Sequence, residues 1–508
     1  MIILNAENTR KAEIKATESN ITLLDLMENA GKAAAQFMID NLDINNKNIV
    51  IMCGKGNNGG DGYVIARYLS GFSKNITIIL ASGEPSTEDS IIMFARSHDI
   101  KHIYYKEKTD AAKICIQNAD IIVDCIFGIG FKGIPRKPID EIIETINTSK
   151  GIKVSIDVPS GIDCDSGFIT DCCIKADYTV TFTTLKPCHV IYPAKEMCGK
   201  VHVANVGIKK SIYKDISNMQ TIDYDYVKNC FKKRKANSNK GDFGKLLSIC
   251  GSLGMAGAAI LAAKSAMHSG AGLVYCAAPE KTADIIASNI TEVVMVYLKQ
   301  NNEGRLSKDN IERLINEIKS KSACLIGCGL GNDNDIFEIV SQIISNSKIP
   351  LIIDADGINA INLNKDILNK CASDIILTPH PGEMARLCSV TPDDIQNHRL
   401  EYAISFIKQY NVILVLKGAN TIIASKDGIF INTTGNAGMA KGGSGDILAG
   451  MIASFAAQGM SALNAAICGV YLHGLAGDMA AEHLSQTAML PSDMISMLPD
   501  IFLQIEKG

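Results

Sequence analysis

The stretch NIVIMCGKGNNGGDGYVIARYL, residues 48–69, passes from an aliphatic run through a glycine-rich loop into a segment with apolar residues at helical spacing. This order predicts a buried strand, a tight turn and a helix. Gly54, Gly56 and Gly59 satisfy the pattern Gly-x-Gly-x-x-Gly. By itself that pattern fits either a tight strand-to-helix turn or the phosphate-binding loop of a dinucleotide-dependent dehydrogenase.

Short aliphatic runs alternate with helical stretches over the whole of residues 49–206. This alternation predicts a mostly parallel sheet with helices on both faces, a three-layer α/β/α domain of Rossmann-like type. The preceding segment 21–42 has helical periodicity with Thr22 as a candidate N-cap, and we expect it to pack on the sheet. The aliphatic runs are NIVIMC, NITIILA, DIIVDCIF, KVSIDVP, YTVTFTT and VHVANV.

A second alternating series follows further along the chain and predicts a second three-layer α/β/α domain. Its segment TIIASKDGIFIN predicts a hairpin around Asp427 and Gly428. The two series do not align as a repeat, so we expect two different α/β folds. The runs of the second series are KLLSICG, GLVYCAAP, ACLIGCGLG, PLIIDADG, DIILTPHPGE and VILVLKGAN.

Between the two series, from 207 to about 243, the chain is polar and basic with few aliphatic runs. We expect the linker here, and we interpret the KKRK run at 232–235 as part of a solvated segment rather than a nucleic-acid patch, because the rest of the chain has no basic surplus. The predicted domains are 1–212 and 225–508, joined by a linker at 213–224.

Composition narrows the range of partners. The 50 basic and 54 acidic side chains give a net charge of −4, which does not favour nucleic acid or an anionic membrane as a partner. The 16 cysteines are scattered through aliphatic segments, so we expect a reduced cytoplasmic location and no structural zinc. The start lacks the features of a signal peptide, and Lys264 and His268 interrupt the most apolar segment, so neither export nor a membrane span is expected.

Polar side chains gather where three runs of the first half end. Asn57, Asn58 and Asp61 bring oxygen atoms into a loop where a plain phosphate cradle needs only backbone N–H groups. Asp124 precedes a second glycine loop, and SIDVPSGID places Asp157 and Ser160 in a third. Each acid alone fits a turn or a helix cap, but three converging strand ends favour a site for a cation or a hydroxylated ligand.

The combination of GNNGGDG, VDCIFGIG and IDVPSGID resembles the NAD(P)HX epimerase family over residues 1–210. The resemblance implies that this domain interconverts the two C6 epimers of a hydrated nicotinamide dinucleotide, with Asp157 as the candidate acid or base. It also implies a potassium ion held by Asn58, Asp124 and Ser160. The residues that it places against the substrate are Asn57, Asn58, Gly59, Gly60, Asp61, Gly128, Ile129, Gly130, Phe131, Lys132, Gly133, Ile134 and Asp157.

The second half has its own convergence of strand ends, which offer Gly329, Gly331, Asp354, Asp356, His380 and Lys417. The segment AKGGSGD, residues 440–446, then leads into a helix, and its glycines let successive N–H groups turn towards one anion. Asp446 in the first turn is either a capping acid or a base that accepts the proton of an alcohol during phosphoryl transfer. We expect the helix field to favour its ionised form. No Walker A pattern occurs.

The segments GNAGMAKGGSGDILAG, TPHPGEMARL and KGANT resemble the ADP- or ATP-dependent NAD(P)HX dehydratases of the ribokinase-like superfamily, over about residues 225–505. The resemblance implies that Asp446 activates the C6 hydroxyl, that the nucleotide with Mg²⁺ phosphorylates it, and that phosphate then leaves. It places the adenine nucleotide against Lys417, Gly418, Ala419, Asn420, Thr421 and Gly445. It places the hydrated substrate against Ala256, Gly331, His380 and Asp446.

Together the two resemblances imply a bifunctional lyase and isomerase that acts on NADHX and NADPHX and converts ADP or ATP to AMP or ADP and phosphate. They also suggest a homo-oligomer. Two alternatives remain open at this point. The second domain fits a true small-molecule kinase equally well in its spacing, and the first domain could be a noncatalytic binding module.

Overall fold

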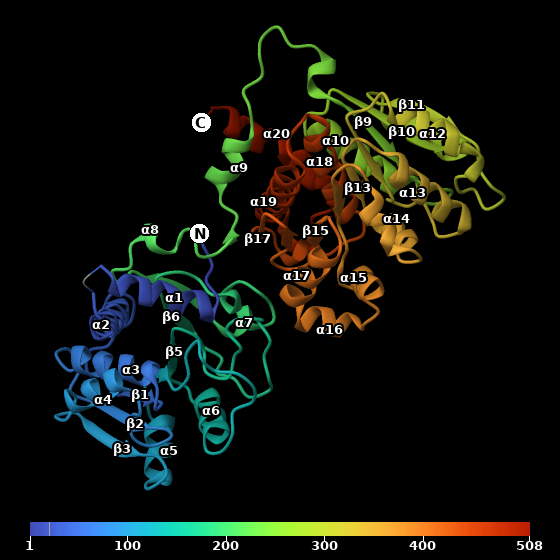
Figure 1. Cartoon of the computed structure of the whole chain (residues 1–508). Helices are drawn as coiled ribbons and strands as arrows, with labels where there is room; N and C mark the ends of the chain where they lie inside the picture. Colours follow the sequence, from blue (N-terminus) through green and yellow to red (C-terminus); the bar gives the residue numbers. More distant parts are fainter. Residues whose placement is uncertain (20, 508) are drawn as a thin grey trace. The chain divides into compact units, whose positions relative to one another are not determined.

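The computed structural model describes residues 1–19 and 21–507 of the chain. These residues form two compact units, Met1–Met219 and Gln220–Gly508 (Figure 1). The division lies inside the segment 213–224, and the exact ends of the two functional domains stay a prediction.

The first unit is built on a seven-stranded sheet in which every strand pair is parallel, in the order β3-β2-β1-β4-β5-β6-β7. The order reverses direction between β1 and β4, and in open α/β sheets ligands bind at the carboxyl ends of the strands at such a point. The strands are β1 (Ile49–Cys53), β2 (Ile76–Leu80), β3 (Lys101–Tyr104), β4 (Ile121–Cys125), β5 (Ile152–Ile156), β6 (Tyr178–Phe182) and β7 (Lys200–Ala204).

Side chains of β1 alternate between two cores because successive residues of a strand face opposite ways. Ile49 and Ile51 pack with residues of α2 and α3, whereas Val50 and Met52 pack with residues of α5 and α6. Thr22 caps α2 as the sequence predicts, with a capping box to Asp25. The helices are α1 (Ala6–Thr17), α2 (Leu23–Asn41), α3 (Asn57–Leu69), α4 (Glu88–Ala95), α5 (Thr109–Gln117), α6 (Ile139–Thr148), α7 (Ala194–Met197) and α8 (Lys210–Tyr213).

The second unit contains a ten-stranded sheet in the order β11-β10-β9-β12-β13-β14-β15-β16-β17-β8. Strands β9 to β15 pair in parallel, and β16 and β17 form the predicted antiparallel hairpin, with Ser425 opposite Gly428. The strands are β8 (Met219–Thr221), β9 (Lys245–Ile249), β10 (Leu273–Pro279), β11 (Val294–Leu298), β12 (Ala323–Ile326), β13 (Leu351–Ile353), β14 (Ile375–Leu377), β15 (Ile413–Leu416), β16 (Ile422–Ser425) and β17 (Gly428–Ile431).

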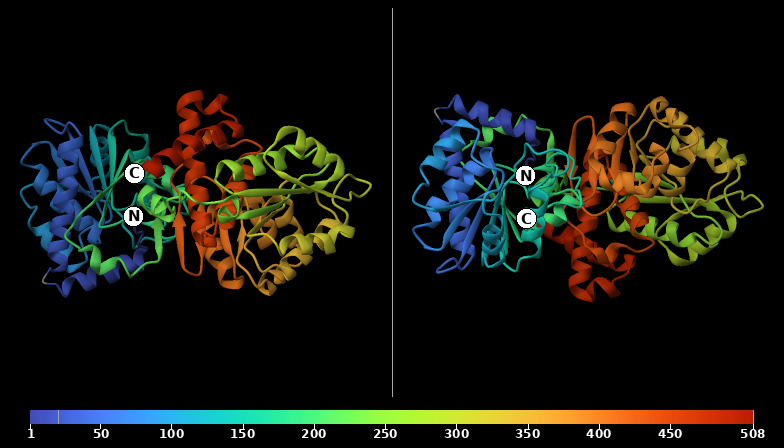
Figure 2. Two further views of the ribbon diagram at one scale, coloured as in Figure 1. Left: turned by 90° about the horizontal axis from the view of Figure 1, so that it is seen from above. Right: turned by 90° about the horizontal axis from the view of Figure 1, so that it is seen from below.

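One large core lies under α10, α11, α18, α19 and α20, and α12, α13 and α14 cover the opposite face of the sheet (Figures 1 and 2). The predicted three-layer architecture of both halves is therefore confirmed. Within the described residues no helix is long and apolar enough to cross a membrane. The helices are α9 (Tyr224–Cys230), α10 (Ala256–His268), α11 (Glu280–Asn289), α12 (Ile311–Ile318), α13 (Asn334–Asn346), α14 (Ala355–Ile361), α15 (Pro381–Cys388), α16 (Pro392–Asn397), α17 (Arg399–Gln409), α18 (Ser444–Ala457), α19 (Ala462–Ala488) and α20 (Pro491–Lys507).

Candidate active sites

The glycine loop of the first unit is shaped by close backbone approaches. A Cβ at Gly54 would lie 2.0 Å from the carbonyl oxygen of Ile126, and a Cβ at Gly59 would lie 2.1 Å from the carbonyl oxygen of Gly54. Only glycine fits these two positions. The loop therefore sits directly against the segment after β4, and Asn57 and Asn58 begin α3 at that junction.

Asp124 and Ser160 form one buried hydrogen-bonded unit at the ends of β4 and β5. The Asp124 carboxylate accepts hydrogen bonds from Ser155 Oγ (2.9 Å), Ser160 N (2.8 Å), Ser160 Oγ (2.6 Å) and Ile126 N (3.2 Å). Burial raises the pKa of Asp124, and these four donors oppose that rise. The unit ties the ends of β4 and β5 together.

Asn58 supplies the atom that best fits a cation. Its Nδ2 donates to the carbonyl oxygens of Phe127 (2.8 Å) and Ile156 (3.2 Å), whereas its Oδ1 is buried without a hydrogen-bond partner. A buried orphan oxygen is costly unless something binds it. Asn58 Oδ1 is therefore an oxygen of the kind that an alkali cation takes as a ligand.

Asp157 has a strained backbone conformation, and its carboxylate forms an ion pair with Lys186. Its φ of 65° lies in the left-handed region, and its Oδ1 accepts hydrogen bonds from Lys186 Nζ (2.6 Å) and Thr181 Oγ1 (3.0 Å). Burial alone would raise the pKa of Asp157, but the Lys186 ammonium outweighs it and brings the pKa below the ordinary value. His189 Nε2 lies 2.9 Å from the Asp157 carbonyl oxygen, and burial lowers the pKa of this imidazole to about 3. Asp157 is thus ionised while His189 is neutral.

Two further acids, Asp61 and Glu13, lie near Asp157, and their pKa values are raised rather than lowered. Burial, followed by the charge of Asp157, raises the pKa of Asp61 well above its ordinary value and also raises that of Glu13 on α1. Neighbouring carboxyl groups whose pKa values are pushed apart can serve as an acid and a base in one site. Asp61 is the candidate acid and Asp157 the candidate base.

Only the start of the segment 128–134 adjoins the other residues of this site. A Cβ at Gly128 would lie 3.4 Å from Asn58, so the start of the segment adjoins the glycine loop. Phe131 stacks on Phe127 with ring centroids 4.4 Å apart. Lys132 Nζ instead lies 3.2 Å from Asp165, and Ile134 is 68% exposed. The later residues face solvent and neighbouring acids.

In the second unit Asp354 is the centre of the polar network. Its Oδ1 accepts hydrogen bonds from Thr378 Oγ1 (2.7 Å) and Lys417 Nζ (2.7 Å), and Cys328 Sγ lies 3.7 Å from its Oδ2. Burial acts to lower the pKa of Lys417, but Asp354 and Glu383 outweigh it and raise that pKa. Lys417 is therefore a permanent cation at the carboxyl ends of β13, β14 and β15.

Asp446 lies in the first turn of α18, behind a glycine-rich loop. Gly443 has a φ of 100°, and a Cβ at Gly445 would lie 3.3 Å from Lys417 Nζ. Burial and the neighbouring carboxylate of Asp354 raise the pKa of Asp446 to about 6, against the influence of Lys417. The helix field expected from the sequence is only one influence on Asp446, whereas burial and Asp354 raise this pKa; at about 6 it still leaves Asp446 mostly ionised at neutral pH.

His380 is first of all a helix cap. Its Nδ1 accepts a hydrogen bond from the N–H of Gly382 (3.0 Å), and its own N–H donates to Glu383 Oε2 (2.7 Å) at the start of α15. Burial and Lys417 lower the pKa of His380, so its imidazole is neutral, and its Nε2 lies 3.4 Å from Glu383 Oε1. Gly331 N donates to Asp356 Oδ2 (2.8 Å), and Ala256 begins α10.

Lys417–Thr421 forms a tight connection between β15 and β16. Gly418 and Asn420 have φ values of 139° and 51°, and Thr421 Oγ1 donates to the Gly418 carbonyl (3.0 Å). Lys417 N donates to the Pro379 carbonyl (2.9 Å), so this loop and the His380 loop are joined. Gly445 approaches the same lysine, which brings the predicted nucleotide-binding residues together.

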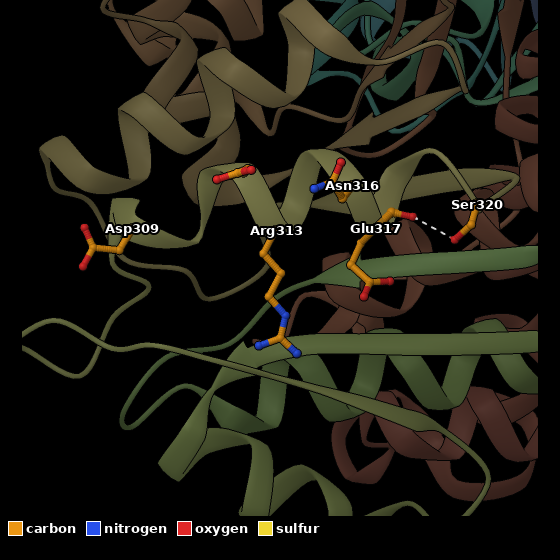
Figure 3. Close-up of a pocket in the computed structure, with 6 residues that line it drawn as sticks. Asp309, Arg313, Asn316, Glu317 and Ser320 are labelled. Carbon is orange, nitrogen blue, oxygen red and sulfur yellow. Dashed lines mark hydrogen bonds between the residues drawn. The ribbon is translucent and has the colours of Figure 1, made fainter.

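A hollow of about 470 Å³ over α12 does not belong to either site (Figure 3). It is lined by Asp309, Arg313 and Glu317 among others, and these side chains point in different directions. Arg313 Nη1 is already hydrogen-bonded to the Tyr297 carbonyl (2.6 Å). The hollow is a charged helix surface.

Comparison with known proteins identifies the family. A family model described as NAD(P)H-hydrate dehydratase matches residues 246–500, and one described as YjeF-related protein N-terminus matches residues 23–188. The bifunctional NAD(P)H-hydrate repair enzyme Nnr of Moorella thermoacetica is 36% identical over 528 residues, covering 100% of this chain and 97% of that protein. The chain belongs to the family of bifunctional NAD(P)H-hydrate repair enzymes.

Two solved structures are similar to part of this chain. A ribokinase-like superfamily protein of Enterococcus faecalis superimposes with a TM-score of 0.51 at 27% identity, covering 57% of this chain and 98% of that one. The ADP/ATP-dependent NAD(P)H-hydrate dehydratase of Bacillus subtilis, co-crystallised with ATP and Mg²⁺, has a TM-score of 0.49 at 29% identity and covers 57% of this chain and 99% of that one. The predicted ribokinase-like fold is confirmed by the first of these.

As a member of the NAD(P)H-hydrate repair family the protein is a bifunctional lyase and isomerase, and the alternative of a small-molecule kinase fused to a noncatalytic module is set aside. Sequence reasoning missed two buried cations of this repair enzyme, Lys186 and Arg399, which are each 1% exposed. Lys186 could have been found, because it follows the run YTVTF within a few residues, at another strand end. Arg399 carries no such signal.

Proposed function

We propose that the second unit removes water from the S epimer of NADHX or NADPHX at the expense of ADP or ATP, using the site around Asp446, and that the first unit interconverts the R and S epimers around Asp157. The observation that carries the proposal is the placement of Asp446. A carboxyl group with a pKa near 6 stands at the glycine-lined start of α18, beside the Lys417 ammonium. A base and an anion site in contact suit phosphoryl transfer to a hydroxyl.

In the second unit Asp446 takes the proton of the C6 hydroxyl as that oxygen attacks the terminal phosphorus of the nucleotide. The N–H groups at the start of α18 and the Lys417 ammonium stabilise the charge on the moving phosphoryl group. The C6–oxygen bond then breaks with loss of the C5 proton, phosphate leaves, and the nicotinamide double bond returns. Mg²⁺ arrives with the nucleotide as part of the substrate complex.

In the first unit the ionised Asp157 accepts the C6 hydroxyl proton and Asp61 gives a proton to the ring nitrogen as the C6–nitrogen bond breaks. The C6 aldehyde then rotates, and the reverse proton transfers close the ring on either face. Lys186 holds Asp157 ionised, and Asn58 orients the glycine loop. A potassium ion on Asn58, Asp124 and Ser160 would supply positive charge to the substrate phosphates.

Small nucleotides are the partners that these two sites suit. We also propose a homo-oligomer, on the basis of the family resemblance, and a cytoplasmic location, which fits the absence of disulfides among the described residues. The functional domains are 1–212 and 225–508.

The test uses purified R and S epimers of NADHX with ADP and Mg²⁺. The expected products from either epimer are NADH, AMP and phosphate in equal amounts, without an accumulating phosphorylated ring. Asp446→Asn should abolish NADH formation from both epimers, whereas Asp157→Asn should abolish it from R alone. A stable phosphorylated product would show that the second unit is a kinase.

A further inference from the structure

Arg399 is a buried cation that none of the steps above uses. It begins α17, is 1% exposed and is the largest fully buried side chain among residues 1–19 and 21–507. Burying a charge without a counter-charge is unfavourable. In the part of the chain that the structure describes, no carboxylate forms an ion pair with Arg399, and burial is the sole cause that lowers its pKa to about 10. The guanidinium therefore stays protonated at neutral pH.

Backbone carbonyls take the place of a carboxylate. Arg399 Nη1 donates to the Ala419 carbonyl, and Nη2 donates to the carbonyls of Leu416 (3.2 Å) and Lys417 (3.4 Å). All three acceptors belong to the end of β15 and the loop that follows it. The guanidinium thus holds the backbone of this loop through three hydrogen bonds.

The loop conformation depends on that support. A Cβ at Gly418 would lie 3.0 Å from Arg399 Nη2, and both Gly418 and Asn420 have positive φ. In a trans peptide the C=O and the N–H point in opposite directions. When Arg399 draws the carbonyls of Lys417 and Ala419 inward, the N–H groups of Gly418 and Asn420 are directed to the opposite side.

We propose that Arg399 is a positioning residue for the nucleotide: it fixes the loop Lys417–Thr421 so that the N–H groups of Gly418 and Asn420 face the bound nucleotide, and its unneutralised charge favours that anion. The inference rests on the proposed contact between this loop and the adenine nucleotide. It adds a residue that lies behind the loop and acts through it, and it assigns a reason for a buried charge without a carboxylate partner.

The experiment compares Arg399→Met, Arg399→Lys and a control, Phe406→Leu. Phe406 is buried on the same helix and packs on Tyr410, away from the loop, so its change destabilises α17 without touching the carbonyls. The measurements are kcat, the KM for ADP, the KM for S-NADHX and the thermal unfolding temperature of each full-length protein.

Arg399→Met should raise the KM for ADP about tenfold or more, because it removes charged hydrogen bonds, and should leave the KM for S-NADHX unchanged. Arg399→Lys keeps the charge without the planar fork and should give an intermediate KM for ADP. Phe406→Leu should lower the unfolding temperature with both KM values unchanged. If Arg399→Met does not fold, the KM for ADP of Arg399→Lys tests the inference: a raised KM supports it and an unchanged KM overturns it.

A purely structural role would make the Arg399 variants behave like Phe406→Leu, with less active protein and an unchanged KM for ADP, and that result would overturn the inference. Wild-type protein that needs no nucleotide would instead refute the proposed function. The two failures are therefore distinguishable.

Discussion

Replacing Asp446 with Asn should make the protein more stable at alkaline pH while it abolishes dehydration. The folded-state pKa of Asp446, about 6, lies above the ordinary value of 3.8, so the folded protein binds this proton more tightly than the unfolded chain does. Ionisation of Asp446 therefore costs stability above pH 6, and this cost fades as the pH falls through 6 towards 3.8. Asn resembles the protonated form and avoids the cost.

The size of the effect follows from the shift. Two pKa units correspond to about 3 kcal/mol, and because Asp446 is only partly buried we halve this to about 1.5 kcal/mol. The substitution also removes the favourable interaction of the ionised Asp446 with the helix dipole, which offsets about 0.5 kcal/mol of this gain. The net gain of about 1 kcal/mol should raise the unfolding temperature of the second unit by about 2 °C.

The assay is differential scanning calorimetry of wild-type protein and Asp446→Asn from pH 4 to pH 8. The difference in unfolding temperature should be largest at pH 8 and should vanish near pH 4. Asp393→Asn is the control, because Asp393 is exposed in the first turn of α16 and should show no such gain. A variant that is less stable than wild type at pH 8, or a gain that does not depend on pH, would refute the reasoning.

Three other substitutions probe the two sites. Lys186→Met should leave Asp157 buried without its cation, destabilise the first unit by about 3–5 kcal/mol and stop consumption of the R epimer. The double variant Lys186→Met with Asp157→Asn should regain stability, as measured by calorimetry. Gly445→Ala would place a Cβ 3.3 Å from Lys417 Nζ and should raise the KM for ADP roughly tenfold in steady-state assays, with an unchanged value counting against the site. Asn58→Ala should remove any dependence of epimerisation on potassium, and a potassium response equal to wild type would contradict the cation site.

The positions of the strands along the chain and the residues at their carboxyl ends could be predicted, because aliphatic runs and glycine loops are local signals. Asp124, Asp157, Asp354 and Lys417 all follow such runs, and the structure brings them together within their own units. Local sequence was sufficient for these positions because a parallel sheet collects strand ends at one edge.

The charge states could not be predicted in the same way. The pKa of Asp446 depends on Asp354, which comes from a different strand, and on burial by the folded unit. Arg399 stands in the segment NHRLEY and has the sequence pattern of a solvated basic residue, yet the fold buries it behind the loop after β15. These neighbours are brought together by tertiary packing, and the periodicity of the sequence does not indicate them.

The residues of the segment 128–134 have different surroundings. Its first residues adjoin Asn58, but Lys132 pairs with Asp163 and Asp165, and Ile134 is exposed. The roles of these later residues in substrate contact stay a prediction.

The most direct test of the account mixes the full-length protein with acid-hydrated NADH, which contains both epimers, and follows the absorbance of reduced nicotinamide with and without ADP and Mg²⁺. The absorbance should recover completely with nucleotide and not at all without it. Recovery that stops at about half would contradict epimerisation by the first unit, and no recovery with either ADP or ATP would contradict the dehydratase assignment of the second.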